Sequence, residues 1–184
     1  ATSDFKFSGD KIYLVGSSKQ ELGASELAYM MVESGRAAGI GGQVPQLPHP
    51  EQNLATYRAL STSIRAGWVR TAHDCSEGGL AVALAEMCIG GRIGATVDID
   101  GSGEADVWGR LWGESLGRFV VAVSPQHEAS FLAAMKGHPT TVLGQVVDDD
   151  VLTITDGDDA LISMDVGTMA TVWKGTLDLT GGVA

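Results

Sequence analysis

Apolar residues occur along the chain in two patterns, short runs and helical spacing, and these patterns predict two kinds of secondary structure. Short runs rich in β-branched residues, bounded by glycine or by acidic residues, predict strands. These runs lie at residues 11–16, 68–72, 94–99, 118–123, 140–147, 151–155 and 161–164. Stretches with apolar residues three or four positions apart predict helices. The predicted helices are one that follows Ser25 and those at 50–67, 80–88, 107–112, 125–135 and 166–174.

The order of these elements sets the expected fold class. Strands and helices alternate irregularly, which favours an α/β (α+β) layered fold with helices packed against a mixed sheet. A chain of 184 residues has the usual length of one domain, so we expect a single domain over residues 1–184. The pattern leaves the order of the strands in the sheet open. The first six residues read as a linker from a longer chain.

Individual residues refine three of these expectations. Ser25 is expected to cap its helix, which would bury Leu27, Met30 and Met31. The helix at 50–67 starts at a proline, which the first helical turn tolerates, and ends at a glycine. The carboxylates at 148–150 and 158–159 lie where β-hairpins are expected to turn. We therefore interpret them as solvated turn residues rather than metal ligands.

A short polar loop with two glycines separates a predicted strand from the helix at 80–88. The loop contains Asp74, Ser76, Gly78 and Gly79. In such a turn the unpaired N–H groups and the positive end of the helix dipole converge, and glycine allows a ligand to approach closely. A carboxylate is a suitable Mg²⁺ ligand, and a hydroxyl can bond a phosphate oxygen. A second interpretation is structural: Asp74 or Ser76 caps the helix, and the glycines allow tight packing.

Charge and cysteine content narrow the class of partner. The net charge is −11 and the isoelectric point is near 4.6, which argues against a nucleic-acid or anionic-membrane surface. The chain contains no apolar run long enough to span a bilayer, and its N-terminus lacks the pattern of a signal peptide. The two cysteines make no disulfide framework, so we expect a cytoplasmic protein. We interpret Cys88 as a core residue and Cys75 as a bystander rather than a reactive thiol.

Other charged residues have both a functional and a structural interpretation. The carboxylates at 98, 100, 104 and 106 lack the EF-hand pattern, which favours a solvated acidic face over a calcium site. Arg118 follows Glu114 by four residues. We interpret the two as a structural ion pair rather than as catalytic groups, and leave open whether Glu114 touches a ligand.

Several sequence blocks resemble one enzyme superfamily. The segment Ala72–Glu86, with its D-x-S-x-G-G-L core, resembles the C-terminal domain signature of the aminoimidazole ribonucleotide (AIR) synthase-related superfamily. Further blocks follow in the order that this superfamily shows, at 9–16, 21–26, 41–45, 113–121 and 173–177. The resemblance extends over nearly the whole chain. The blocks are most similar to the last domain of the synthetase subunit in the phosphoribosylformylglycinamidine (FGAM) synthase family.

The resemblance implies a fold and a function. The fold would be the C-terminal α/β domain of the superfamily. FGAM synthases use ATP and glutamine-derived ammonia to amidate formylglycinamide ribonucleotide in purine biosynthesis, and their catalytic histidines lie in preceding N-terminal domains that this chain lacks. The resemblance therefore implies no catalytic residue here, Mg²⁺ at Asp74, and nucleotide phosphates at Ser76 with Gly78 and Gly79. His73 is expected to orient the loop.

The resemblance also implies partners, and it leaves alternatives. ATP or ADP would bind together with the missing N-terminal domains. The protein partners would be those upstream domains, a glutaminase subunit and a small accessory subunit, with no nucleic acid and no membrane. Leu116 replaces the glutamine usual in the superfamily, which argues against a polar ligand contact there. One alternative is a domain of another ATP-using enzyme of the superfamily, such as AIR synthetase, and another is a non-catalytic domain that docks subunits.

Overall fold

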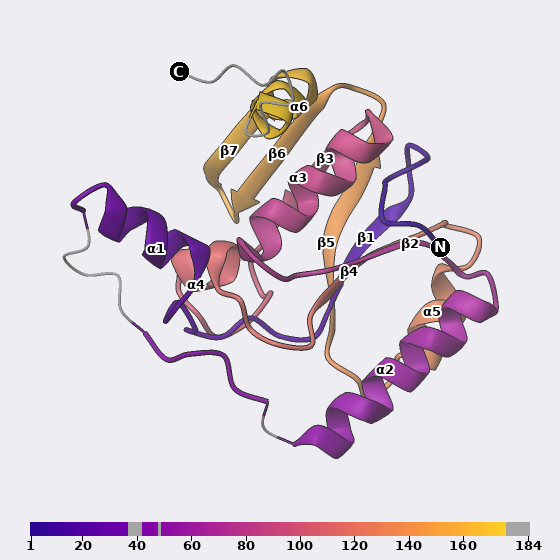
Figure 1. Cartoon of the computed structure of the whole chain (residues 1–184). Helices are drawn as coiled ribbons and strands as arrows, with labels where there is room; N and C mark the ends of the chain where they lie inside the picture. The colour runs from indigo at the N-terminus through magenta and orange to yellow at the C-terminus, as the bar shows by residue number, and fades with distance from the viewer. Residues whose placement is uncertain (37–41, 48, 176–184) are drawn as a thin grey trace.

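The computed structural model describes residues 1–36, 42–47 and 49–175, which form one mixed sheet with helices on both faces (Figure 1). The seven strands lie in the order β2-β4-β1-β5-β3-β6-β7. In chain order they are β1 (Lys11–Val15), β2 (Val69–Asp74), β3 (Gly94–Asp98), β4 (Phe119–Val123), β5 (Thr140–Val147), β6 (Val151–Asp156) and β7 (Asp159–Asp165). The predicted fold class, a mixed sheet flanked by helices, is confirmed.

Helices pack on both faces of the sheet. The helices are α1 (Glu26–Glu33), α2 (Pro50–Arg65), α3 (Gly79–Gly91), α4 (Val107–Trp112), α5 (Glu128–Ala134) and α6 (Val166–Gly175). Helices α3, α4 and α6 contribute to one hydrophobic cluster with the sheet, and α2 and α5 contribute to a second cluster. Within the described residues, no helix is long and apolar enough to cross a membrane.

The central strands are buried on both faces because their side chains alternate between the two clusters. In β1, Ile12 and Leu14 belong to the cluster under α3, whereas Tyr13 and Val15 belong to the cluster under α2 and α5. The same alternation holds along β4. Both strands consequently read as continuous apolar runs, which is typical of strands covered on two sides.

The strand order corrects one expectation about the acidic turns. The turn at 157–159 joins β6 and β7, which pair antiparallel as the predicted hairpin requires. The residues at 148–150 do not close a hairpin, because β3 lies between β5 and β6 and pairs parallel with β6. This connection instead carries the chain past β3. Its Asp149 carbonyl accepts a 2.6 Å hydrogen bond from the Gly94 N–H at the start of that strand.

The predicted burial of α1 is wrong, although its cap is correct. The Ser25 side chain accepts from the Ala28 N–H at 3.2 Å, as expected of an N-cap. No residue of the helix is buried, and Met30 is 62% exposed. Leu27 and Met31 are half-buried. Three-residue spacing describes which side chains share a helix face, but not whether another element covers that face.

The other helices follow the sequence more closely. Helix α2 starts at Pro50 and ends one residue before Ala66, its C-cap, close to the predicted range. Helix α5 is shorter than predicted and buries Phe131, whereas Leu132 is 44% exposed. The blocks at 41–45 and 173–177 lie partly outside the described residues.

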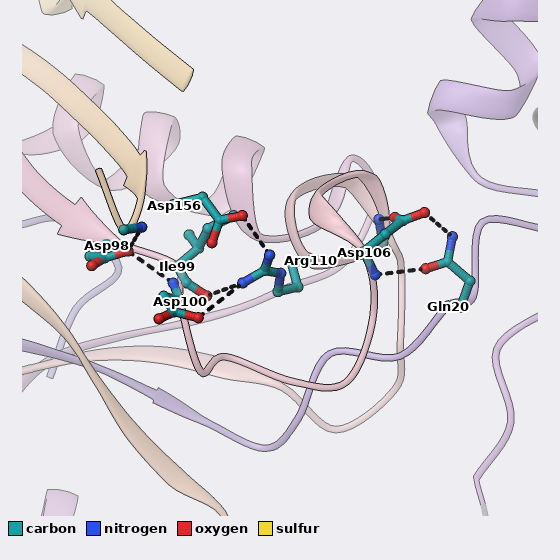
Figure 2. Close-up of polar contacts among 9 residues, drawn as sticks. Gln20, Asp98, Ile99, Asp100, Asp106, Arg110 and Asp156 are labelled. Carbon is teal, nitrogen blue, oxygen red and sulfur yellow. Dashed lines mark hydrogen bonds and ion pairs between the residues drawn. The ribbon is translucent and has the colours of Figure 1, made fainter. Parts of the chain in front are cut away.

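The acidic residues around β3 carry structural contacts (Figure 2). Asp98 accepts from the backbone N–H groups of Asp100 and Gly157, both at 2.9 Å. Asp106 caps α4 by accepting from the Gly109 N–H at 2.9 Å. These carboxylates therefore serve turns and a helix end, which is a more specific role than the solvated face predicted from sequence.

Arg110 joins three segments at the same place (Figure 2). It lies on α4 and forms a 2.6 Å ion pair with Asp156 at the end of β6. Its second terminal nitrogen donates to the Ile99 carbonyl after β3 at 3.2 Å and lies 3.7 Å from Asp100. The side chain thus ties α4 to the ends of two strands.

Candidate functional site

The predicted glycine loop joins the end of β2 to the start of α3. Asp74 is the last residue of the strand, and Gly78 is the N-cap of the helix. Gly78 and Gly79 have φ angles of 74° and 67°, which L side chains rarely adopt. A Cβ at Gly79 would lie 2.6 Å from the Gly113 carbonyl oxygen and 2.8 Å from that of Leu111. The tight packing expected of these glycines is therefore confirmed.

The helix N-terminus is capped by a residue from a distant segment. The Gly78 N–H donates to Glu114 Oε1 at 2.9 Å, and the Gly79 N–H donates to the Ser76 carbonyl at 3.0 Å. No side chain of Asp74 or Ser76 caps the helix, so that structural interpretation is wrong. In this structure the Gly78 and Gly79 N–H groups both have acceptors within the chain.

Glu114 and Arg118 do not form the predicted ion pair. Glu114 Oε1 accepts from the Glu26 N–H at 2.9 Å as well as from Gly78. Arg118 donates to the Ser18 hydroxyl at 2.8 Å, to the Ser115 carbonyl at 3.2 Å and to the Gly113 carbonyl. The loop geometry explains the difference, since it places backbone groups closer to each charge than the other side chain.

Arg118 is buried beneath the site and holds two chain segments together by hydrogen bonds. The residue is 1% exposed, and burial lowers the pKa of its guanidinium, opposed by the nearby Cys75, Glu21 and Glu114. Its three hydrogen bonds fix the segment between α4 and β4 against the segment after β1. Because these donors are directed to the protein itself, Arg118 positions the site rather than reaching a phosphate.

Cys75 is buried in the same loop. Burial raises the pKa of its thiol to about 11, opposed by the positive charge of Arg118. At neutral pH the group is therefore a thiol, and the thiolate is the reactive form. This geometry supports the prediction that Cys75 is a bystander.

A cleft of about 530 Å³ opens beside the loop and collects the predicted ligand residues. Asp74 and Ser76 line it, together with Glu77, Glu114 and Leu116. The Asp74 side chain is 67% exposed and so remains accessible. Leu116, 52% exposed, presents an apolar side chain to the cleft. The structure thus brings Asp74 and Ser76 together, while Gly78 and Gly79 shape the turn behind them.

The donor set at Asp74 fits one kind of magnesium site. Among the described residues, no group of three or more His, Cys, Asp or Glu side chains is arranged to hold a metal ion. Magnesium is commonly held by one or two carboxylates together with substrate phosphates and water. Asp74 can supply such a carboxylate, and Ser76 can bond a phosphate oxygen beside it. The residues present therefore fit an ion shared with a phosphate ligand.

His73 contacts both sides of the turn. Its Nδ1 lies 2.7 Å from the Asp74 carbonyl oxygen, and its Nε2 lies 3.1 Å from Glu86 Oε2 on α3. The ring thus connects the end of β2 to α3, which supports its predicted role in orienting the loop. His73 and Glu86 also line a separate cavity of about 760 Å³ that extends to Trp173 on α6.

The contacts of two site residues were not predicted from sequence, which paired Glu114 with Arg118 and gave Glu21 no partner. Glu114 joins the ends of two helices, and Glu21 is 3% exposed and accepts from the Gln46 N–H at 3.1 Å. Both belong to blocks that carry the superfamily resemblance, at 21–26 and 113–121. That membership was the available signal, but it did not identify their partners, which lie far away in the chain.

The chain matches one known protein family and resembles several solved structures. The family model described as AIR synthase related protein, C-terminal domain, matches residues 8–157. The crystal structure of phosphoribosylformylglycinamidine synthase II from Thermotoga maritima is similar, with 21% identity and a TM-score of 0.72. The match covers 92% of this chain and 27% of that chain. This chain therefore spans about a quarter of the length of that synthase.

Two other structures share the fold. The T. maritima PurL complexed with ATP is 22% identical, with a TM-score of 0.68, over 92% of this chain and 27% of that chain. Hydrogenase maturation protein HypE in complex with ATP is 15% identical, with a TM-score of 0.59, over 89% and 53%. These likenesses concern the fold. The family match, which extends over more than half of the sequence, shows that the chain belongs to the AIR synthase related protein C-terminal domain family.

Proposed function

We propose that this chain is the C-terminal domain of an FGAM synthase, a single domain over residues 1–184 within a longer enzyme. The enzyme would use ATP to convert formylglycinamide ribonucleotide into FGAM in purine biosynthesis. The observation that supports this most directly is the cleft at the end of β2. There this chain, which belongs to the family, has Asp74 beside Ser76. The likeness to PurL structures with ATP and with FGAR adds support at the level of the fold.

In this proposal Asp74 binds Mg²⁺ and Ser76 binds a phosphate oxygen of ATP or ADP. When bound, the ion would neutralise phosphate charge at a site that is otherwise acidic. The loop residues then orient the nucleotide, with Gly79 and Arg118 holding the turn in place. The proposal assigns no catalytic residue to this chain.

The proposed partners follow from the same assignment. They are the upstream domains of the same enzyme, a glutaminase subunit and a small accessory subunit, in the cytoplasm. Among the structures that share the fold is one of PurLQS from T. maritima. Because this chain spans 27% of the synthase length, we expect the purified chain alone not to turn over formylglycinamide ribonucleotide. Measured turnover by the chain alone would contradict this part of the proposal.

Thermal unfolding with and without Mg²⁺-ADP tests the nucleotide site. A ligand that binds only the folded state adds about 2.7 kcal/mol of stability at a hundred times its dissociation constant. We expect this stabilisation for the wild type and its loss in Asp74→Ala. The matched control is Asp158→Ala, which removes an exposed carboxylate in the β6–β7 turn and should keep the effect.

Two results would count against the nucleotide assignment. Equal stabilisation of wild type and Asp74→Ala would place the ligand elsewhere. Absence of stabilisation in the wild type, combined with a stable complex with the two accessory subunits, would favour the docking alternative.

A further inference from the structure

One carboxylate caps two helices beside the cleft. Glu114 lies in the loop between α4 and β4, and its Oε1 accepts from the Gly78 N–H and from the Glu26 N–H, both at 2.9 Å. Gly78 is the N-cap of α3, and Glu26 is the first residue of α1. The two helices are far apart in sequence, so this oxygen is a contact that joins them.

A helix N-terminus attracts anions because its first N–H groups and the helix dipole both present positive charge. At the N-terminus of α3 an anionic group is already present, because the Glu114 carboxylate accepts the hydrogen bond from the Gly78 N–H. The next N–H, that of Gly79, donates to the Ser76 carbonyl. A phosphate oxygen could reach Gly78 only by displacing Glu114.

The charges around the cleft oppose a free phosphate as well. Asp74, Glu77 and Glu114 all line it. Arg118, the only arginine that lines the cleft among the described residues, is 1% exposed and donates to Ser18, Ser115 and Gly113. A phosphate that arrives without a cation therefore meets carboxylates, and no cationic side chain among the lining residues is directed toward it.

We propose that the Glu114 carboxylate holds the N-termini of α1 and α3 together through its two hydrogen bonds. The same carboxylate prevents free phosphate from binding at these N-termini. Glu114 is a positioning and specificity-determining residue: the cleft accepts phosphate only as part of a metal complex bound from the Asp74 side. The second half of this statement rests on the proposed nucleotide function. The first half depends on the hydrogen bonds of Glu114 alone.

The test uses inorganic phosphate without metal or nucleotide, with binding measured by calorimetric titration at fixed ionic strength. We expect no saturable binding to the wild type and saturable binding to Glu114→Ala, with affinity gained by at least about tenfold. Glu114→Gln keeps an oxygen acceptor for the two N–H groups but loses the charge. We expect a smaller gain from it, and it replaces the alanine variant if that variant does not fold.

Glu77→Ala is the matched control, because it removes the same charge from the cleft without removing a helix cap. A gain at Glu114 that is absent at Glu77 supports the proposal. Equal gains in phosphate affinity at both positions would show that only the net charge of the cleft matters, and would overturn the proposal. Saturable phosphate binding by the wild type, or no gain in either Glu114 variant, would also overturn it. Because the readout contains no nucleotide, failure of the Mg²⁺-ADP test leaves this result separately interpretable.

Discussion

At the scale of single residues, the site is organised by charged side chains that bind backbone groups. Glu114 takes two N–H groups, and Arg118 donates to two carbonyls and a hydroxyl. A charge that bonds the backbone fixes the path of a loop, whereas an exposed ion pair contributes little to stability. These contacts explain how a glycine-rich turn keeps a defined geometry.

Gly79→Ala should lower the free energy of unfolding by about 2–4 kcal/mol. A left-handed conformation costs an L residue about 1–2 kcal/mol, and the added Cβ would overlap two carbonyl oxygens. Gly101→Ala is the matched control, because Gly101 has a φ of 73° with nothing within 4 Å of an added Cβ. We expect about 1–2 kcal/mol there, measured by urea denaturation. Equal losses at the two positions would show that the close approach at Gly79 is unimportant.

Both cysteines should react slowly with thiol reagents in the folded protein. Burial raises the pKa of Cys75 to about 11 and that of Cys88 to about 12. For Cys75, the shift from 9.0 leaves about 100-fold less thiolate at neutral pH, before hindrance by burial is counted. The measurement is the labelling rate with a chromogenic disulfide, with denatured protein as the control. Rapid labelling of Cys75 in the folded state would contradict its role as a bystander.

At the scale of elements, helix ends and strand ends are held by specific polar contacts. Asp165 accepts from the Thr168 N–H at 2.7 Å and from its hydroxyl at 2.9 Å, at the start of α6. Asp106 and Glu114 act similarly at α4 and at α1 and α3. Carboxylate contacts of this kind thus occur at the N-termini of α1, α3, α4 and α6.

The Asp165 cap predicts a pH dependence of stability. The hydrogen bonds from Thr168 lower the pKa of Asp165 below its ordinary 3.8. A carboxyl whose pKa is lower in the folded state stabilises the fold above the unfolded-state pKa, and this contribution is lost as pH falls through the folded-state pKa. Asp165→Asn should therefore lose less stability than the wild type between pH 5 and pH 2. Urea denaturation at both pH values measures this, with Asp158→Asn as the control that should behave as the wild type.

Arg110 predicts a larger effect than a surface ion pair. Its side chain is 13% exposed, and its removal would leave the Asp156 carboxylate, which is 23% exposed, without its ion pair. We expect Arg110→Gln to cost about 1–3 kcal/mol of unfolding free energy. The control is Lys6→Gln, which removes the exposed pair with Asp4 and should cost less than about 1 kcal/mol. The account of this junction is wrong if the two variants are equally stable in urea.

At the scale of the whole molecule, the sequence predicted the elements better than their arrangement. The apolar run of β1 and the helical period of α2 are local patterns, and both elements form close to where they are predicted. The insertion of β3 between β5 and β6 depends on pairing between distant segments, which local spacing does not encode. For the same reason the turn at 148–150 looked like a hairpin.

The candidate site shows the same division between local and distant information. Asp74 and Ser76 are close in sequence, so their shared place on the cleft could be predicted from the motif. The caps on Gly78 and Glu26 come from Glu114, which is separated from them by 36 and 88 residues. A sequence pattern identified Glu114 as a member of a block, but only the fold shows which N–H groups it meets.

The central claim is that a metal–nucleotide binds this chain at the cleft beside Asp74. The most direct measurement is a titration of ¹⁵N-labelled protein with Mg²⁺-ADP, followed by the backbone amide signals in NMR spectra. We predict that saturable shifts concentrate at residues 74–77 and 114–117 and disappear in Asp74→Ala. Shifts centred instead on Arg92, Asp150 and Trp173, which line the larger cavity, would contradict the claim, as would unchanged spectra at saturating nucleotide.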